Sequence, residues 1–329
     1  MKSKILFLFT ACILLFNSCK KAKEVAPEPP PPATTSFVAC EPNTVFDPGT
    51  AAGARLIFKF VFDSTQARLD NLGNPSTVTA GNAAQSPKFN FMSQHYIELA
   101  GDTNPVGGGT ILYNGTTTTV GGSSAIDYCS SIQTNQNVIF FSKPLSQITP
   151  GSYKWLRISL AYQNYNITYK ANALPGNQLG SGTLGSFIGF KTYIAGYKIN
   201  GTSYKPSVNS GGPGNHLQGY WAFQTSVAGQ TYFADGQSAG STTVPNPLFA
   251  SSPIPAGSCL VTGQFVNNTM ANSPLVITGS ETTDIVITVS LSTNKSFEWK
   301  EVTADGYYQP EIGENVVDMG IRGLIPIKN

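Results

Sequence analysis

The sequence predicts an all-β protein: an antiparallel β-sandwich with long polar loops, preceded by a Pro-rich tether. In three segments, apolar and more polar residues alternate with a period of two, which is typical of strands that pack one face on a core. The predicted inward-facing residues are Leu56, Phe58, Phe60 and Phe62 in the first segment, Leu156, Ile158, Leu160 and Tyr162 in the second, and Ile285, Ile287, Val289 and Leu291 in the third. Turn-rich pieces such as NPVGGGT and NSGGPGN separate the strands, as such a sandwich requires.

Further strands and one short helix complete the predicted domain. The strands are expected at residues 94–99, 138–142, 186–191, 193–199, 219–225, 260–265, 275–278 and 296–300. The helix would cover residues 64–71, with Asp63 as its N-cap. Residues 200–218 and 229–258 are long polar stretches, which in compact domains are more often binding or covering loops than linkers. Residues 38–329 are therefore predicted to form a single domain.

The first 18 residues have the form of a secretory signal. Lys2 and Lys4 precede residues 5–16, an apolar run without charge that is too short to span a bilayer. Removing this segment takes away two basic residues and no acidic one, so the basic residues fall from 20 to 18 and equal the 18 acids. Without net positive charge or a basic stripe, nucleic acid is excluded as an expected partner.

The apolar run ends in Phe16-Asn17-Ser18-Cys19. This ending resembles the lipobox of bacterial lipoproteins of the Bacteroidota kind, although Phe16 and Asn17 replace the commoner Leu and small residue. The resemblance implies cleavage before Cys19 and fatty acylation of that cysteine. Each buried CH₂ contributes roughly 0.8 kcal/mol, so two or three acyl chains would anchor the chain firmly. A plain signal peptide that leaves Cys19 unmodified is the alternative.

Residues 19–37 are predicted to be a flexible linker. They are Pro-rich and contain little apolar surface, so they cannot form a packed core. Pro29–Pro32 favour an extended polyproline II spacer. The lipoprotein resemblance places the domain at the outer membrane and leaves its face open. Because surface-export signals of these lipoproteins are acidic just after the cysteine, the basic start KKAKE favours the periplasmic face.

Three cysteines remain after Cys12 leaves with the signal and Cys19 takes the lipid. An odd number in an oxidising compartment allows at most one internal disulfide. We expect Cys40 to pair with Cys259, which would clamp the start of the domain to its late strands. The two pairings with Cys129, and three free thiols, stay open.

Residues 301–318 contain a candidate calcium site. The segment resembles a degenerate EF-hand-like loop, with the carboxylates and hydroxyl at Glu301, Thr303, Asp305, Glu314 and Asp318 as its candidate ligands. Calcium binds six to eight hard oxygens, and Gly306 permits the sharp turn that such a loop needs. The sequence departs from the pattern, since position twelve is Ile312 and Glu314 comes two residues late. A turn at Asp305-Gly306 with solvated carboxylates is the alternative.

A second candidate site lies in the stretch AYQNYNITY. Tyr162, Tyr165 and Tyr169 could stack on sugar rings, and Gln163 and Asn164 could offer paired hydrogen bonds to sugar hydroxyls. The alternative is that these aromatic residues fill the sandwich core.

Metal binding by histidine has little support, because His95 and His216 are the only histidines and no metal-ligand spacing is present. The order of the segments FMSQHYIEL, PGSYKWLRISL and QGYWAF is similar to that of the copper-binding MbnP-like domains of exported proteins. The resemblance covers scattered strands and assigns no ligand to any residue of this sequence.

The sequence contains no nucleophile elbow, P-loop, HExxH motif or dinucleotide fingerprint. We therefore expect a binding module rather than an enzyme, with a glycan or an envelope protein as its partner. An anchored glycan hydrolase is the first alternative, because it needs only two facing carboxylates. The second is a structural subunit that docks another envelope protein through a sheet edge.

Overall fold

The computed structural model describes residues 39–40, 52–101, 108–171, 179–208, 211–238, 254 and 259–329. These ranges form an all-β sandwich of strands and short 3₁₀ turns and contain no α-helix. The predicted signal segment, Cys19 and the linker of residues 19–37 lie outside the described residues. No helix in the described ranges has the length and apolar character needed to cross a bilayer.

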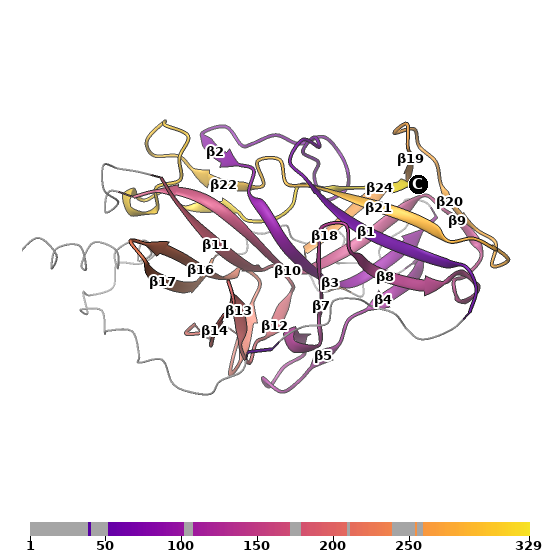
Figure 1. Ribbon diagram of the computed structural model, residues 1–329, viewed down its shortest axis with the longest axis horizontal. Helices are drawn as coiled ribbons and strands as arrows, with labels where there is room; N and C mark the ends of the chain where they lie inside the picture. Colours follow the sequence, from indigo (N-terminus) through magenta and orange to yellow (C-terminus); the bar gives the residue numbers. More distant parts are fainter. Residues whose placement is uncertain are drawn as a thin grey trace, which may run out of the picture.

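Two large sheets make up the sandwich (Figure 1). The five-stranded sheet has the order β19 (Val266–Asn267), β24 (Leu324–Lys328), β21 (Ile285–Ser292), β1 (Arg55–Asp63), β8 (Ile139–Pro144). The eight-stranded sheet has the order β17 (Gln230–Gln237), β16 (Tyr220–Val227), β11 (Leu179–Phe187), β10 (Trp155–Lys170), β3 (Lys88–Ala100), β4 (Thr110–Asn114). Two further strands belong to this sheet: β18 (Cys259–Gln264) pairs with β10, and β7 (Ile132–Asn135) pairs with β3.

Four smaller sheets accompany the two large ones in the described residues. They are β15 (Asn215–Leu217), β12 (Lys191–Tyr193), β6 (Ala125–Asp127) and β5 (Thr117–Thr118); the hairpin β13 (Tyr197–Ile199) and β14 (Thr202–Tyr204); β2 (Asn82–Gln85), β22 (Phe297–Lys300) and β23 (Val316–Asp318); and β20 (Leu275–Ile277) with β9 (Gly151–Tyr153). The 3₁₀ turns are η2 (Tyr128–Ser130), η3 (Leu145–Gln147) and η7 (Pro310–Ile312).

The alternating patterns of β1 and β21 form the main core as predicted. Phe58 and Phe60 of β1 and Val289 of β21 are fully buried, and they pack with residues of the eight-stranded sheet in one cluster. The pairing direction differs from the expectation, because β1 and β21 run parallel, with Phe60 opposite Val289. The five-stranded sheet is therefore mixed, although most pairings in the molecule are antiparallel.

Strand β10 departs from its predicted alternation. Leu156, Ile158 and Leu160 face the main core, but Tyr162 belongs to a second cluster with Phe187. The pairing of β10 with β3 shifts register between Leu160 and Tyr162, which moves the following side chains to the opposite faces. Both faces of β10 are buried for most of its length, so the predicted wetter face is absent from this strand.

The predicted helix at residues 64–71 does not form. Asp63 accepts hydrogen bonds from the backbone N–H groups of Thr65 and Gln66, which is the start of a capped turn. The chain then leaves helical geometry, since the Leu69 N–H donates to the Arg322 carbonyl and Leu69 bridges to Pro75. Tertiary pairing prevails over the local helix signal here.

Candidate functional site

A polar pocket of about 580 Å³ is lined by residues of the hairpin β13–β14 and of neighbouring strands. The hairpin lies against β11 (Figure 1). The pocket residues come from β3, β10, β11, β16 and that hairpin. Five lining residues carry amides (Asn90, Asn164, Asn166, Asn200 and Gln224) and four carry hydroxyls (Ser181, Thr183, Thr225 and Ser226). The described lining also includes Lys198 and Phe91 and contains no carboxylate.

Hydrogen bonds join the amides across neighbouring strands. The Asn90 Nδ2 donates to Oδ1 of Asn164 at 2.7 Å and to Oδ1 of Asn166 at 3.2 Å. The Thr183 hydroxyl also donates to Oδ1 of Asn166, at 2.7 Å. Side chains from β3, β10 and β11 are therefore held in fixed orientations before any ligand binds, which lowers the entropy cost of binding.

The tip of the hairpin forms one wall of the pocket. Asn200 and Gly201 have φ angles of 48° and 77°, and they connect Ile199 to its partner Thr202. An Asn-Gly pair with both φ angles positive is the preferred two-residue hairpin turn. The turn places the Asn200 amide against β11, where its Nδ2 donates to the Thr183 hydroxyl at 2.9 Å.

A second contact of the hairpin holds Gln224, which lines the pocket. The Tyr204 hydroxyl donates to Oε1 of Gln224 at 2.9 Å. The Tyr204 ring is in turn stacked on Phe233 of β17, with ring centroids 3.8 Å apart. The hairpin is thus held to β17 by an aromatic stack and to Gln224 of β16, a lining residue of the pocket, by a hydrogen bond.

The pocket offers both donors and acceptors in close array. Amides supply both N–H and C=O groups, and hydroxyls can serve in either role. Such a lining matches a ligand that is itself rich in hydroxyl groups, and it contains none of the paired carboxylic acids that glycoside hydrolysis commonly uses. The arrangement therefore suits reversible binding of a polar ligand.

Of the five residues predicted to bind a ligand, only Asn164 lines the pocket. Tyr162, Tyr165 and Tyr169 are 1%, 0% and 4% exposed and belong to the two hydrophobic cores. Gln163 is fully buried as well. The predicted exposed aromatic platform is wrong, because β10 lies in the middle of the large sheet and is covered on both faces.

Sequence reasoning did not find Asn90, Asn166, Asn200 or Gln224. These residues lie far apart in the chain, and only the strand pairings bring them together. One usable signal was present: Asn200-Gly201 directly follows the predicted strand 193–199, and Asn-Gly is a strong hairpin indicator.

The predicted calcium loop does not assemble. Glu301 accepts the Gly306 N–H at 2.6 Å, and Glu314 accepts the N–H groups of Val302 and Gln309 at 3.1 and 2.6 Å. These carboxylates satisfy backbone donors of the loop. Gly306 has φ of 74°, which agrees with the turn that was the alternative interpretation.

The other predicted calcium ligands form ion pairs. Asp305 binds Nζ of Lys170 at 2.6 Å, and this hydrogen bond, with one from the Tyr307 N–H, lowers the pKa of Asp305. Asp318 pairs with Arg322. The backbone N–H of Thr303 donates to Oε1 of Glu314 at 3.4 Å. No cluster of three or more His, Cys, Asp or Glu side chains suited to a metal occurs in the described ranges.

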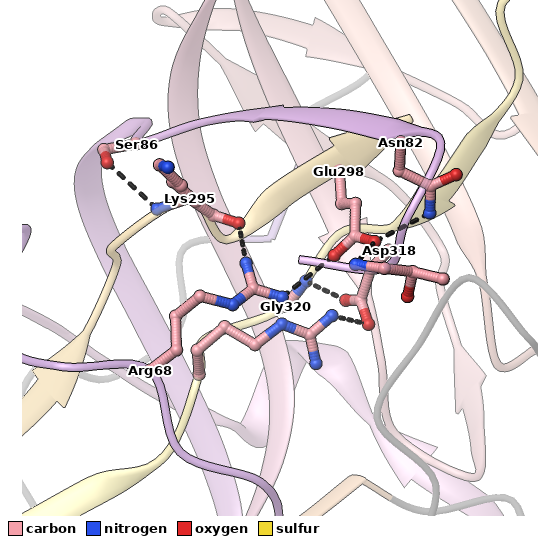
Figure 2. Close-up of polar contacts among 9 residues, drawn as sticks. Arg68, Asn82, Ser86, Lys295, Glu298, Asp318 and Gly320 are labelled. Carbon is pink, nitrogen blue, oxygen red and sulfur yellow. Dashed lines mark hydrogen bonds and ion pairs between the residues drawn. The ribbon is translucent and has the colours of Figure 1, made fainter. Parts of the chain in front are cut away.

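Asp318 of β23 belongs to a buried cluster of ion pairs (Figure 2). The cluster joins the loop after β1 to β22 and to the segment that contains Asp318 and Arg322. Arg68, on the loop after β1, pairs with Glu298 of β22 at 2.9 Å, with side chains 7% and 4% exposed. Glu298 also accepts hydrogen bonds from the Thr79 N–H at 3.1 Å and from Asn82 at 2.7 Å. Burial, and then the charge of Arg68, lower the pKa of Arg322 to about 10. Both carboxylate oxygens of Glu298 accept hydrogen bonds from protein groups. We therefore interpret the cluster as a structural element that stabilises the fold.

The disulfide prediction is wrong in its pairing. Cys40 is bonded to Cys129 in η2, with Cα atoms 5.1 Å apart. Cys259 is a free, fully buried thiol on β18, where it packs in the main core. Burial raises the pKa of Cys259 to about 12, which keeps it in the unreactive thiol form.

Both histidines are buried. Burial lowers the pKa of His95 to about 3 and that of His216 to about 4. His95 lies on β3 and His216 on β15, and each is an uncharged residue at neutral pH.

Comparison with known proteins adds no assignment to this site. No family model, no curated protein and no solved structure matches the chain.

Proposed function

We propose that this chain is a lipid-anchored lipoprotein of the bacterial cell envelope whose β-sandwich binds a glycan in the polar pocket. The observation that carries the proposal is the pocket lining of five amides and four hydroxyls, which are joined by hydrogen bonds across several strands. Sugars present many hydroxyls at short spacing, and a fixed array of donors and acceptors can bind several of them at once.

Binding is favoured over hydrolysis by the chemistry of the lining. Glu298 and Asp318, two of the clustered carboxylates in the C-terminal part of the sequence, are held in the ion-pair cluster. Neither of them lines the pocket. A structural role through an exposed sheet edge is the competing proposal, and it predicts no glycan binding.

A glycan array tests the proposal with the full lipoprotein purified in detergent. We expect binding to at least one class of oligosaccharide, and we expect Asn200→Gly to weaken that binding about tenfold, the loss of roughly one hydrogen bond. Glycine keeps the positive φ of the turn, so the variant removes the amide without straining the hairpin.

Asn137→Gly is the matched control. Asn137 also has a positive φ, of 63°, and it is exposed at a turn outside the pocket. Equal loss of binding in both variants, or no binding by the unmodified protein, would contradict the proposed site.

The anchor is tested separately, by fractionating cells that express Cys19→Ala. We expect the unmodified protein in the membrane fraction and the variant in the soluble fraction, because the acyl chains hold the protein on the bilayer. Membrane retention of the variant would count against the lipoprotein part of the proposal.

A further inference from the structure

Phe91 is the one aromatic residue in the described lining of the pocket. It is half-buried and packs against the second core, with its ring centroid 5.9 Å from that of Tyr162. The rest of the described lining consists of amides, hydroxyls, two glycines and Lys198. The pocket therefore combines one apolar ring with an array of polar groups.

A β-bulge in β3 directs Phe91 to the pocket side of the large sheet. Phe91 lies opposite Asn164 of β10, and the register then shifts. The next pair joins Phe89 to Tyr165, so Asn90 is the extra residue of β3. Phe89 stacks on Tyr165 in the main core, with ring centroids 4.8 Å apart, whereas Phe91 packs on the second core. In a regular strand the two phenylalanines would share a face, and the bulge separates them.

The same bulge brings the Asn90 amide beside Phe91. Asn90 donates to Oδ1 of Asn164 and to Oδ1 of Asn166, and all three amides line the pocket. Amides therefore flank Phe91 along its own strand and across the pairing with β10. A pyranose with equatorial hydroxyls has the same division, because its axial C–H bonds form the ring faces and its hydroxyls extend outward at the edge. Such a ring can contact an aromatic side chain and several polar groups at once.

We propose that the glycan bound here contains a β-linked pyranose with equatorial hydroxyls, and that Phe91 stacks on the ring face that carries the anomeric hydrogen. The inference rests on the proposed function and names the substrate class of the same site. In a β-linked ring of this kind that face carries only C–H groups, whereas an α linkage places an axial oxygen on it. The C–H groups lie against the electron-rich face of Phe91 and leave water, and the amides bind the hydroxyls at the edge.

The test measures affinities of the full lipoprotein, in detergent, for matched β-linked and α-linked oligomers of glucose and of N-acetylglucosamine. We expect the β-linked members to bind more tightly. Phe91→Leu should weaken their binding about tenfold, because leucine lacks the flat surface on which the sugar stacks. Phe91→Tyr keeps an aromatic ring and should retain most of the affinity.

Saturation-transfer NMR on the unmodified protein reports the contact directly. Transfer from the protein should be strongest at the anomeric hydrogen and the other axial hydrogens of the same ring face. This measurement needs no variant, so it tests the stacking even if Phe91→Leu folds poorly.

Phe62→Leu is the matched control. Phe62 of β1 is also a partly buried phenylalanine, but it packs against the main core and does not line the pocket. Its replacement should leave every affinity unchanged. Thermal unfolding of both leucine variants separates lost affinity from lost stability.

Two other outcomes separate this inference from the proposed function. If α-linked oligomers bind as well as β-linked ones and a folded Phe91→Leu keeps full affinity, the stacked β-linked class is overturned while glycan binding stands. If no oligosaccharide of the array binds, the proposed function falls and the inference falls with it.

Discussion

Replacing Glu298 with Gln is expected to destabilise the fold by about 3–5 kcal/mol, the usual cost of breaking a buried ion pair. Arg68 and Glu298 lie 2.9 Å apart and are both almost fully buried. The substitution leaves the Arg68 guanidinium without its counter-charge. It also replaces an acceptor oxygen by an amide N–H₂ group beside the donors of Thr79 and Asn82.

The same residue should give the fold a dependence on acidic pH. Burial alone would raise the pKa of Glu298, but hydrogen bonds from Asn82, Thr79 and Arg68 outweigh it and lower the pKa below 4.5. A carboxylate with a depressed folded-state pKa contributes its stabilisation fully above the unfolded-state value. It loses that contribution as the pH falls through the folded-state value.

Urea unfolding as a function of pH measures both effects. In the unmodified protein, stability should fall as the pH drops below about 4.5, the ordinary value for glutamate. Glu298→Gln should be less stable at neutral pH and should show a smaller loss at acidic pH. A variant as stable as the unmodified protein would contradict the structural role of the cluster.

The ion pair of Lys170 and Asp305 provides the control. Its side chains are 20% and 23% exposed, and such pairs contribute about 0–1 kcal/mol. We therefore expect Lys170→Met to change the unfolding free energy by no more than about 1 kcal/mol.

Removing the disulfide should have a comparably large effect. Replacing both Cys40 and Cys129 with Ala should cost about 2–5 kcal/mol, because the bond restricts the unfolded chain across 89 residues. The bond also fixes the start of the folded domain, since Cys40 packs against the second core. Thermal unfolding with and without a reducing agent measures this contribution.

Reduction should lower the melting temperature of the unmodified protein and leave that of the double variant unchanged. Thiol labelling checks the pairing independently: the native protein should show no reactive thiol, and unfolding without reductant should expose one, at Cys259. A reactive thiol at Cys129 in the native protein would contradict the pairing.

The sequence predicts the regular part of this fold well. In β1 and β21, apolar residues recur at every second position. Six of the eight predicted side chains are buried in the main core, and the other two, Phe62 and Ile285, are partly buried against it. The prediction succeeds because an alternating pattern with one apolar face indicates a strand that buries that face. The parallel pairing of these two strands has no such signal, because alternation does not depend on strand direction.

The sequence predicts β10 and the pocket less well. A register shift after Leu160 sends Tyr162 to the second core, and nothing in local composition marks a β-bulge there. The pocket residues come from chain positions as distant as Asn90 and Gln224, so they become neighbours only through pairing. The prediction of the disulfide pairing failed for a related reason, since three cysteines allow three pairings and the sequence alone does not distinguish among them.

The central claim is that the amide-lined pocket binds a glycan. The most direct measurement is a crystal structure of the protein with the tightest-binding oligosaccharide from the array. We expect a sugar ring within hydrogen-bond distance of Asn166, Asn200 and Gln224. A sugar bound elsewhere on the surface, with this pocket unchanged, would contradict it.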